Sequence, residues 1–176
     1  MALALVHSRA RCGLHAPLVT VEVHLSRGLP GFQLVGLPET SVKEAKDRVR
    51  SALINSGFEF PDHKITVNLA PADLPKEGGR FDLAIALGIL HASGQLQADL
   101  SAYEFFGELA LSGEIRSIVG ELPLALACKM AGHIAVFPLQ NAVQAQQVPN
   151  IQLCGAERLG HGVRIIDDID FSGAEP

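Results

Sequence analysis

The sequence predicts a mixed α/β (α+β) fold, in which early antiparallel strands are followed by βα units. Apolar and polar residues alternate in two segments near the N-terminus, which is typical of half-buried strands. A polar turn then leads into an almost wholly apolar segment at 71–90, which is typical of a buried helix. Beyond residue 115, short apolar segments alternate with helical patterns, and this indicates βα units in one mixed sheet.

The first three strands are predicted from alternation and from turn residues. Ala2 to Arg9 and Leu18 to Leu25 are expected to form an antiparallel hairpin, because both alternate and the second is rich in β-branched residues. Phe32 to Val35 is a third strand, bracketed by Gly31 and Gly36.

The next element is predicted to be a helix that begins at a capping box, Ser41 to Glu44, and stops at Gly57. Its buried face is expected to consist of Val42, Ala45, Val49, Ala52 and Leu53. Its opposite face carries Lys43, Lys46, Asp47 and Arg50. We interpret this as a solvated face, and a basic stripe that faces a ligand stays open as the alternative.

The segment that organises the chain is 71–90, which follows a predicted strand, Lys64 to Ala70. Its second half is too long and too poor in turn residues for a core strand, so we expect a helix buried on most faces that ends near Gly94. Asp82 is the only charge in that half, and it suits the positive end of the helix dipole.

The entrance to this helix is a candidate anion site. Gly78 and Gly79 could present backbone N–H groups to a phosphate or carboxylate, with Arg80 as a bidentate partner and Lys76 nearby. The alternative, which we favour, is that the glycines only fit a tight loop and that Lys76 is solvated.

The C-terminal half is predicted to continue in short elements. A strand at Phe105 to Leu111 turns at Ser112-Gly113 into a second strand, Ile115 to Ile118. The elements expected after this strand are a helix at Pro123 to Met130, a strand at Ile134 to Phe137, a helix at Asn141 to Gln147, and strands at Ile151 to Cys154 and Val163 to Ile166. Residues 1–166 are expected to form a single domain, and residues 167–176 an acidic linker.

Composition and motifs exclude several functions. A net charge of −5 gives no global attraction to nucleic acid, so such binding would need a local patch. The sequence holds no P-loop motif and no histidine pair at metal-ligand spacing. Ser112 and Ser117 lie in or near turns, but no base partner is evident for either serine as a nucleophile. The three scattered cysteines and the N-terminus, which looks like neither a signal peptide nor a membrane span, predict a cytoplasmic protein with reduced thiols.

Two long blocks carry a resemblance to a known family. L-P-G-F-Q-L-V-G-L-P-E-T-S-V-K-E-A-K-D-R-V-R-S-A-L-I-N-S-G-F-E-F-P, followed by K-I-T-V-N-L-A-P-A-D-L-P-K-E-G-G-R-F-D-L, resembles the N-terminal domain of the YifB/ComM proteins, which are Mg-chelatase-related (ChlI-like) bacterial AAA+ ATPases. The resemblance runs along the whole chain. It implies a Lon-protease-like fold of the ribosomal-protein-S-five domain 2-like type, and a chain that is a fragment lacking its AAA+ module.

The Lon-like resemblance also implies where a catalytic Ser-Lys dyad would lie. Arg80 falls at the serine position after the turn that starts at Pro75, and Leu124 falls at the lysine position. Without a hydroxyl nucleophile and an amine base, acyl transfer by that mechanism cannot run. We therefore expect no catalytic residue, cofactor or metal in this chain, with ATP and Mg bound by the AAA+ module.

The resemblance implies a hexameric, ATP-driven DNA motor that acts in branch migration during natural transformation. For this domain we expect a role in ring assembly and in engaging DNA, single-stranded or branched, and no membrane contact. The candidate DNA or anion contacts are Lys43, Lys46, Arg50, Lys64, Lys76, Gly78, Gly79 and Arg80. Two alternatives stay open: a protein-interaction scaffold without DNA contact, and a residual peptidase.

Overall fold

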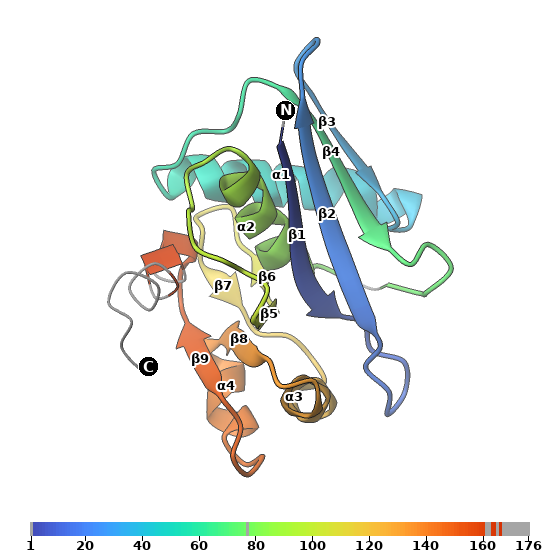
Figure 1. Cartoon of the computed structure of the whole chain (residues 1–176), viewed down its shortest axis with the longest axis vertical. Coiled ribbons are helices and arrows are strands. Elements are labelled where there is room, and N and C mark those ends of the chain that lie inside the picture. Colours follow the sequence, from blue (N-terminus) through green and yellow to red (C-terminus); the bar gives the residue numbers. More distant parts are fainter. Residues whose placement is uncertain (1, 77, 161–162, 165, 167–176) are drawn as a thin grey trace.

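The computed structural model describes residues 2–76, 78–160, 163, 164 and 166. Seven strands form a mixed sheet in the order β3-β4-β2-β1-β5-β8-β9, and β6 and β7 form a separate small hairpin (Figure 1). The strands are β1 (Ala2–Arg9), β2 (Leu18–Ser26), β3 (Gly31–Val35), β4 (Lys64–Ala70), β5 (Tyr103–Phe105), β6 (Glu108–Leu109), β7 (Ile115–Arg116), β8 (Ile134–Pro138) and β9 (Leu153–Ala156). The helices are α1 (Glu39–Asn55), α2 (Asp82–Ala92), α3 (Glu121–Met130) and α4 (Leu139–Ala145).

The sheet combines antiparallel and parallel strand pairs, as the sequence predicts. Strand β1 pairs antiparallel with β2, and β2 pairs antiparallel with β4. The pairs β3/β4, β1/β5, β5/β8 and β8/β9 are all parallel. The prediction of early antiparallel strands followed by βα units is therefore confirmed.

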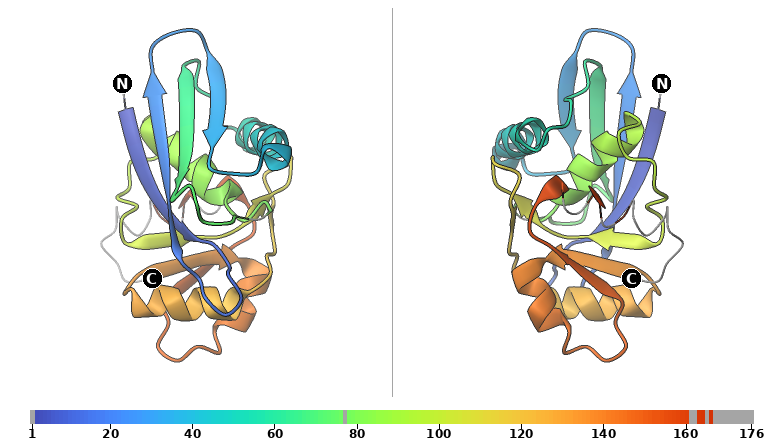
Figure 2. Two further views of the ribbon diagram at one scale, coloured as in Figure 1. Left: turned by 90° about the vertical axis from the view of Figure 1, so that its right-hand side faces the viewer. Right: turned by 90° about the vertical axis from the view of Figure 1, so that its left-hand side faces the viewer.

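Helices α1 and α2 lie on one side of strands β1 to β4 (Figures 1 and 2). The strand residues that face them are aliphatic and buried, for example Val21, Val23 and Val67. Helix α2 is buried from Asp82 to Leu90, which confirms the predicted buried helix. It crosses β2 so closely that a Cβ atom on Gly88 would lie 2.5 Å from Cγ2 of Val23.

Helix α1 buries Ala45, Val49, Ala52 and Leu53, as predicted, but the predicted capping box is wrong. The helix begins at Glu39, directly after Pro38 at the N-cap, and Ser41 makes no capping bond with its side chain. The Ser41 N–H instead donates to the Pro38 carbonyl, because the helix has already begun there. The predicted stop is confirmed, since Gly57 has φ of 87° and its N–H donates to the Ile54 carbonyl.

Two predicted strands are corrected. The segment Phe105 to Leu111 divides at Gly107, whose N–H and C=O groups bond to Arg80 and Leu83 at the start of α2 and not to a strand. The predicted strand Val163 to Ile166 is helical at its described residues. Leu159, Val163 and Ile166 are buried at helical spacing, which the short apolar segment 163–166 does not show by itself. The predicted linker at 167–176 lies outside the described residues.

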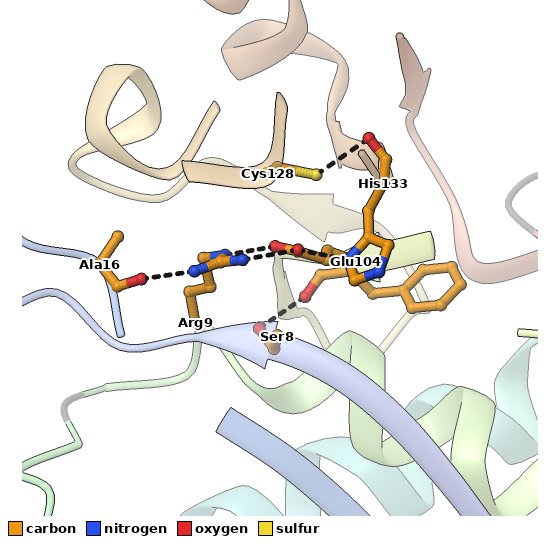
Figure 3. Close-up of polar contacts among 7 residues, drawn as sticks. Ser8, Arg9, Ala16, Glu104, Cys128 and His133 are labelled. Carbon is orange, nitrogen blue, oxygen red and sulfur yellow. Dashed lines mark hydrogen bonds and ion pairs between the residues drawn. The ribbon is translucent and has the colours of Figure 1, made fainter. Parts of the chain in front are cut away.

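A buried polar cluster joins the two halves of the sheet, where β1 meets β5 (Figure 3). Glu104 accepts hydrogen bonds from Arg9, at Oε1 from Nε over 2.6 Å and at Oε2 from Nη2 over 2.9 Å. His133 Nδ1 lies 2.7 Å from the same Oε2 atom. Ser8 donates to the Phe105 carbonyl in the same place. The buried carboxylate is therefore paired, as burial of a charge requires.

Candidate nucleic-acid interface

The structure places two predicted cations, Lys46 and Arg50, over two phenylalanine rings. Helix α1 directs Lys46 towards Phe32 of β3, with Nζ 6.0 Å from the ring centroid. One turn later, Arg50 lies over Phe60, with Cζ 4.8 Å from that centroid. The two rings are 5.5 Å apart and inclined at 45°. We call Lys46, Arg50, Phe32 and Phe60 the cation–aromatic cluster.

The local sequence explains this arrangement. Lys46 and Arg50 are spaced i, i+4, so they project from the same side of α1 about 6 Å apart along its axis. Phe32 lies on the same face of β3 as Leu34, the face that α1 covers, and is half-buried because it lies near the end of the strand. Phe60 is half-buried in the loop between α1 and β4.

Two depressions lie on either side of the ring pair. One, of about 800 Å³, includes Arg50, Phe58, Phe60 and His63 in its lining. The other, of about 400 Å³, includes Arg27, Phe32 and Lys64. Arg27 and Lys64 are both exposed, so the second depression has two cations available to solvent.

The surface also carries acidic residues. Asp47 lies on the exposed side of α1 next to Lys46, and Glu59 and Asp62 lie in the Phe60 loop. Lys43 is exposed three residues before Lys46. The interface is therefore mixed in charge, and Coulomb attraction to phosphates is partly cancelled within it.

Lys76 is located away from the cation–aromatic cluster. Its side chain is buried, at 3% exposure, and Nζ donates to the Pro71 and Leu74 carbonyls over 2.6 and 3.1 Å. Burial lowers the pKa of this ammonium below its ordinary value. The expectation of a solvated Lys76 is wrong, because the lysine closes the loop in which it lies.

The Gly78-Gly79 turn lies against a carboxylate. Gly78 is exposed with φ of 63°, whereas Gly79 is buried so tightly against Glu108 that a Cβ atom there would collide with the carboxylate. Arg80 donates from Nη2 to the Val119 carbonyl over 3.1 Å. Glu108 and the buried Asp82 both place negative charge near the start of α2, which opposes an anion there.

The positions that correspond to the Lon-like dyad hold no nucleophile or amine base. Arg80 is half-buried, and Leu124 is a fully buried residue of α3. Burial raises the pKa of the Cys128 thiol far above its ordinary value, so this cysteine is protonated and unreactive. Among the described residues there is no group of metal-ligating side chains, and no helix is long and apolar enough to cross a membrane.

Sequence reasoning found the cations but missed Arg27, Phe32 and Phe60. A signal was present at Phe60, since the segment F-E-F-P-D-H-K places two phenylalanines in a charged loop, and the structure leaves both half-buried at the edge of the core. No comparable signal existed for Phe32, because its alternation on β3 matches that of a core residue.

Comparison with known proteins identifies the family. The model for subunit ChlI of Mg-chelatase matches residues 21–141. Competence protein ComM of Haemophilus influenzae is 60% identical over 98% of this chain and 37% of its own length. The uncharacterized protein YifB of Salmonella typhimurium is 59% identical over 82% of this chain and 29% of its own length.

A more distant match supports the fold. Lon protease of Leptospira interrogans is 25% identical over 74% of this chain and 16% of its own length. The chain spans about a third of the length of the ComM and YifB relatives. The family model covers most of the chain, and the chain therefore belongs to the YifB/ComM family of Mg-chelatase-related proteins.

Proposed function

We propose that this chain is the non-catalytic N-terminal domain of a YifB/ComM-type ATP-dependent DNA motor, which acts in branch migration during DNA uptake and recombination. The domain contributes to a hexameric ring and engages single-stranded or branched DNA in the cytoplasm. The AAA+ module of the full-length protein binds ATP and Mg. The name of the ComM relative, a competence protein, supports the link to DNA uptake.

The observation that carries the proposal is the placement of three candidate cations beside the Phe32/Phe60 ring pair. Lys46 lies over Phe32 and Arg50 over Phe60, and Lys64 lines the same depression as Phe32. Cations grouped on one surface can neutralise successive phosphates, whereas scattered cations cannot. Lys76 and Arg80 bind backbone carbonyls in other parts of the structure, so we assign them no DNA contact.

The test is DNA binding by this chain at low and moderate salt. Binding should weaken steeply as salt rises, and K46E/R50E should abolish it. D47K is the matched control, because it changes charge on the same side of α1 in the opposite direction and should strengthen binding. If DNA binding is unchanged by higher salt, by K46E/R50E and by D47K, this surface does not contact DNA.

The competing function is a protein-interaction scaffold in which the same charges pair between subunits. In that case K46E/R50E would leave DNA binding unchanged and disrupt oligomers, which sedimentation velocity measures directly. A residual peptidase would require turnover that is lost when one named serine, such as Ser112 or Ser117, is replaced by alanine. We expect no such turnover, because Arg80 and Leu124 occupy the dyad positions.

A further inference from the structure

The cation–aromatic cluster has a feature that phosphate binding alone does not use, namely half-buried aromatic rings. Phe32, Phe58 and Phe60 are half-buried, pack against the edge of the core, and line the two depressions. The other described phenylalanines, Phe81, Phe105, Phe106 and Phe137, are fully buried. The partly exposed aromatic surface therefore coincides with the cations.

Resting on the proposed function, we propose that this cluster recognises unpaired bases, and that the ligand at this site is single-stranded DNA. A base stacks on Phe60 or on the guanidinium plane of Arg50, while phosphates on the Phe32 side of that base contact Lys64 and Arg27. Aromatic rings and guanidinium planes both stack with bases, and every base offers a flat face to them. In a duplex those faces are already covered by neighbouring base pairs.

The depressions make this arrangement sterically feasible. The larger one, about 800 Å³, has Arg50 and Phe60 in its lining, and it adjoins the ring pair from one side. The smaller one has Phe32 with Lys64 and Arg27. A strand that crosses the ring pair thus passes from a recess of mixed character, lined by Phe58, Phe60 and charged residues, to a basic one.

The charge balance gives a second reason for base contact. Asp47, Glu59 and Asp62 lie among the cations, and the chain as a whole carries a net charge of −5. These charges cancel part of the phosphate attraction that the cations supply. Stacking does not depend on net charge, so it supplies affinity that the mixed surface cannot supply by Coulomb attraction.

The experiment measures binding of this chain to three fluorescent ligands at one low salt concentration: an oligo(dT) strand, a strand of the same length made of abasic sites, and a duplex. The intact single strand should bind about tenfold or more tightly than the abasic strand, which keeps the phosphates and lacks the bases. The duplex should also bind more weakly than the single strand. Equal affinity for all three ligands would overturn base recognition.

Two variants locate the effect. F60L keeps an apolar side chain but removes the stacking face, and R50K keeps the charge but removes the guanidinium plane. Each should lower affinity for oligo(dT) about tenfold and leave the abasic strand nearly unaffected. R116K is the matched control, because Arg116 is exposed on β7 and lines a depression that contains no phenylalanine. Each variant should have the far-UV circular dichroism spectrum and the melting temperature of the wild type, which would exclude misfolding.

The outcomes separate this inference from the proposed function. If the chain binds intact and abasic strands equally, with K46E/R50E sensitivity, DNA engagement stands and base recognition fails. If the chain binds none of the three ligands even at low salt, both fail. If oligo(dT) binding is strong but unchanged in F60L and R50K, bases are read elsewhere and the cluster is not the site.

Discussion

Arg48 of α1 and Asp82 of α2 form a buried ion pair that ties the two helices together. Arg48 Nε lies 2.6 Å from Oδ2 of Asp82, and Nη2 lies 3.3 Å from Oδ1. The Leu109 N–H also donates to Oδ2, so the carboxylate additionally anchors β6. Asp82 is 1% exposed. The only charge in the apolar half of the 71–90 segment thus organises the helix packing.

Removing one member of this pair should be costly. R48M keeps the aliphatic stem but leaves the Asp82 carboxylate buried without its cation, so we expect a loss of about 3–5 kcal/mol in the free energy of unfolding. Urea denaturation measures this loss. In the D82N background the same change should cost much less, because no buried charge remains to be paired. Equal costs in both backgrounds would show that the pair contributes no coupling.

The pair should also make stability depend on pH. Burial raises the pKa of Asp82 to about 6, although hydrogen bonds from Arg48 and Leu109 lower it. The same Asp82 bond raises the pKa of Arg48, so the pair is ionic above pH 6. Because the folded pKa exceeds the value of 3.8 expected in the unfolded chain, the stability contributed by Asp82 is present below pH 3.8 and is lost as pH rises through 6.

We expect the difference in free energy of unfolding between wild type and D82N to change by about 3 kcal/mol when the pH rises from 3.5 to 7. Wild type should lose stability relative to D82N as pH rises across this interval. Urea titrations at several pH values measure the difference, and other carboxylates cancel in the comparison. Parallel curves for the two proteins would contradict the raised pKa.

Close packing of α2 on β2 predicts an effect at Gly88. G88A places a methyl group 2.5 Å from Cγ2 of Val23, and the resulting repacking should cost about 1–3 kcal/mol. The better helix propensity of alanine offsets up to about 1 kcal/mol of that cost. Thermal denaturation measures the net change. In a V23A background the cost should shrink, because the opposing methyl groups are removed.

Replacing Lys76 tests whether this residue has a structural role or contacts DNA. K76M keeps the length of the side chain but leaves the Pro71 and Leu74 carbonyls without their donor, so the free energy of unfolding should fall by about 1–3 kcal/mol. DNA affinity of the folded variant should not change, whereas K64E should lower it. A loss of DNA affinity in K76M without a loss of stability would reverse this assignment.

The sequence by itself determined the local elements, because their causes are local. Alternation in β1 and β2 and the apolar run of α2 were sufficient, since burial on one face or on all faces leaves a direct pattern in the chain. The cations Lys46 and Arg50 were found for the same reason, as neighbours on one helix face.

Only the tertiary structure decided which distant groups meet. Gly107 leaves the sheet because its hydrogen-bonding groups are used by Arg80 and Leu83, which lie more than twenty positions earlier in the chain. Arg48 and Glu44 have the i, i+4 spacing of a helix pair, yet the short contact of Arg48 is with Asp82, and Lys76 donates to backbone carbonyls of its own loop. Phe32 and Phe60 became neighbours through packing of α1 on β3. Long-range contacts such as these follow from how the elements pack, which no local pattern encodes.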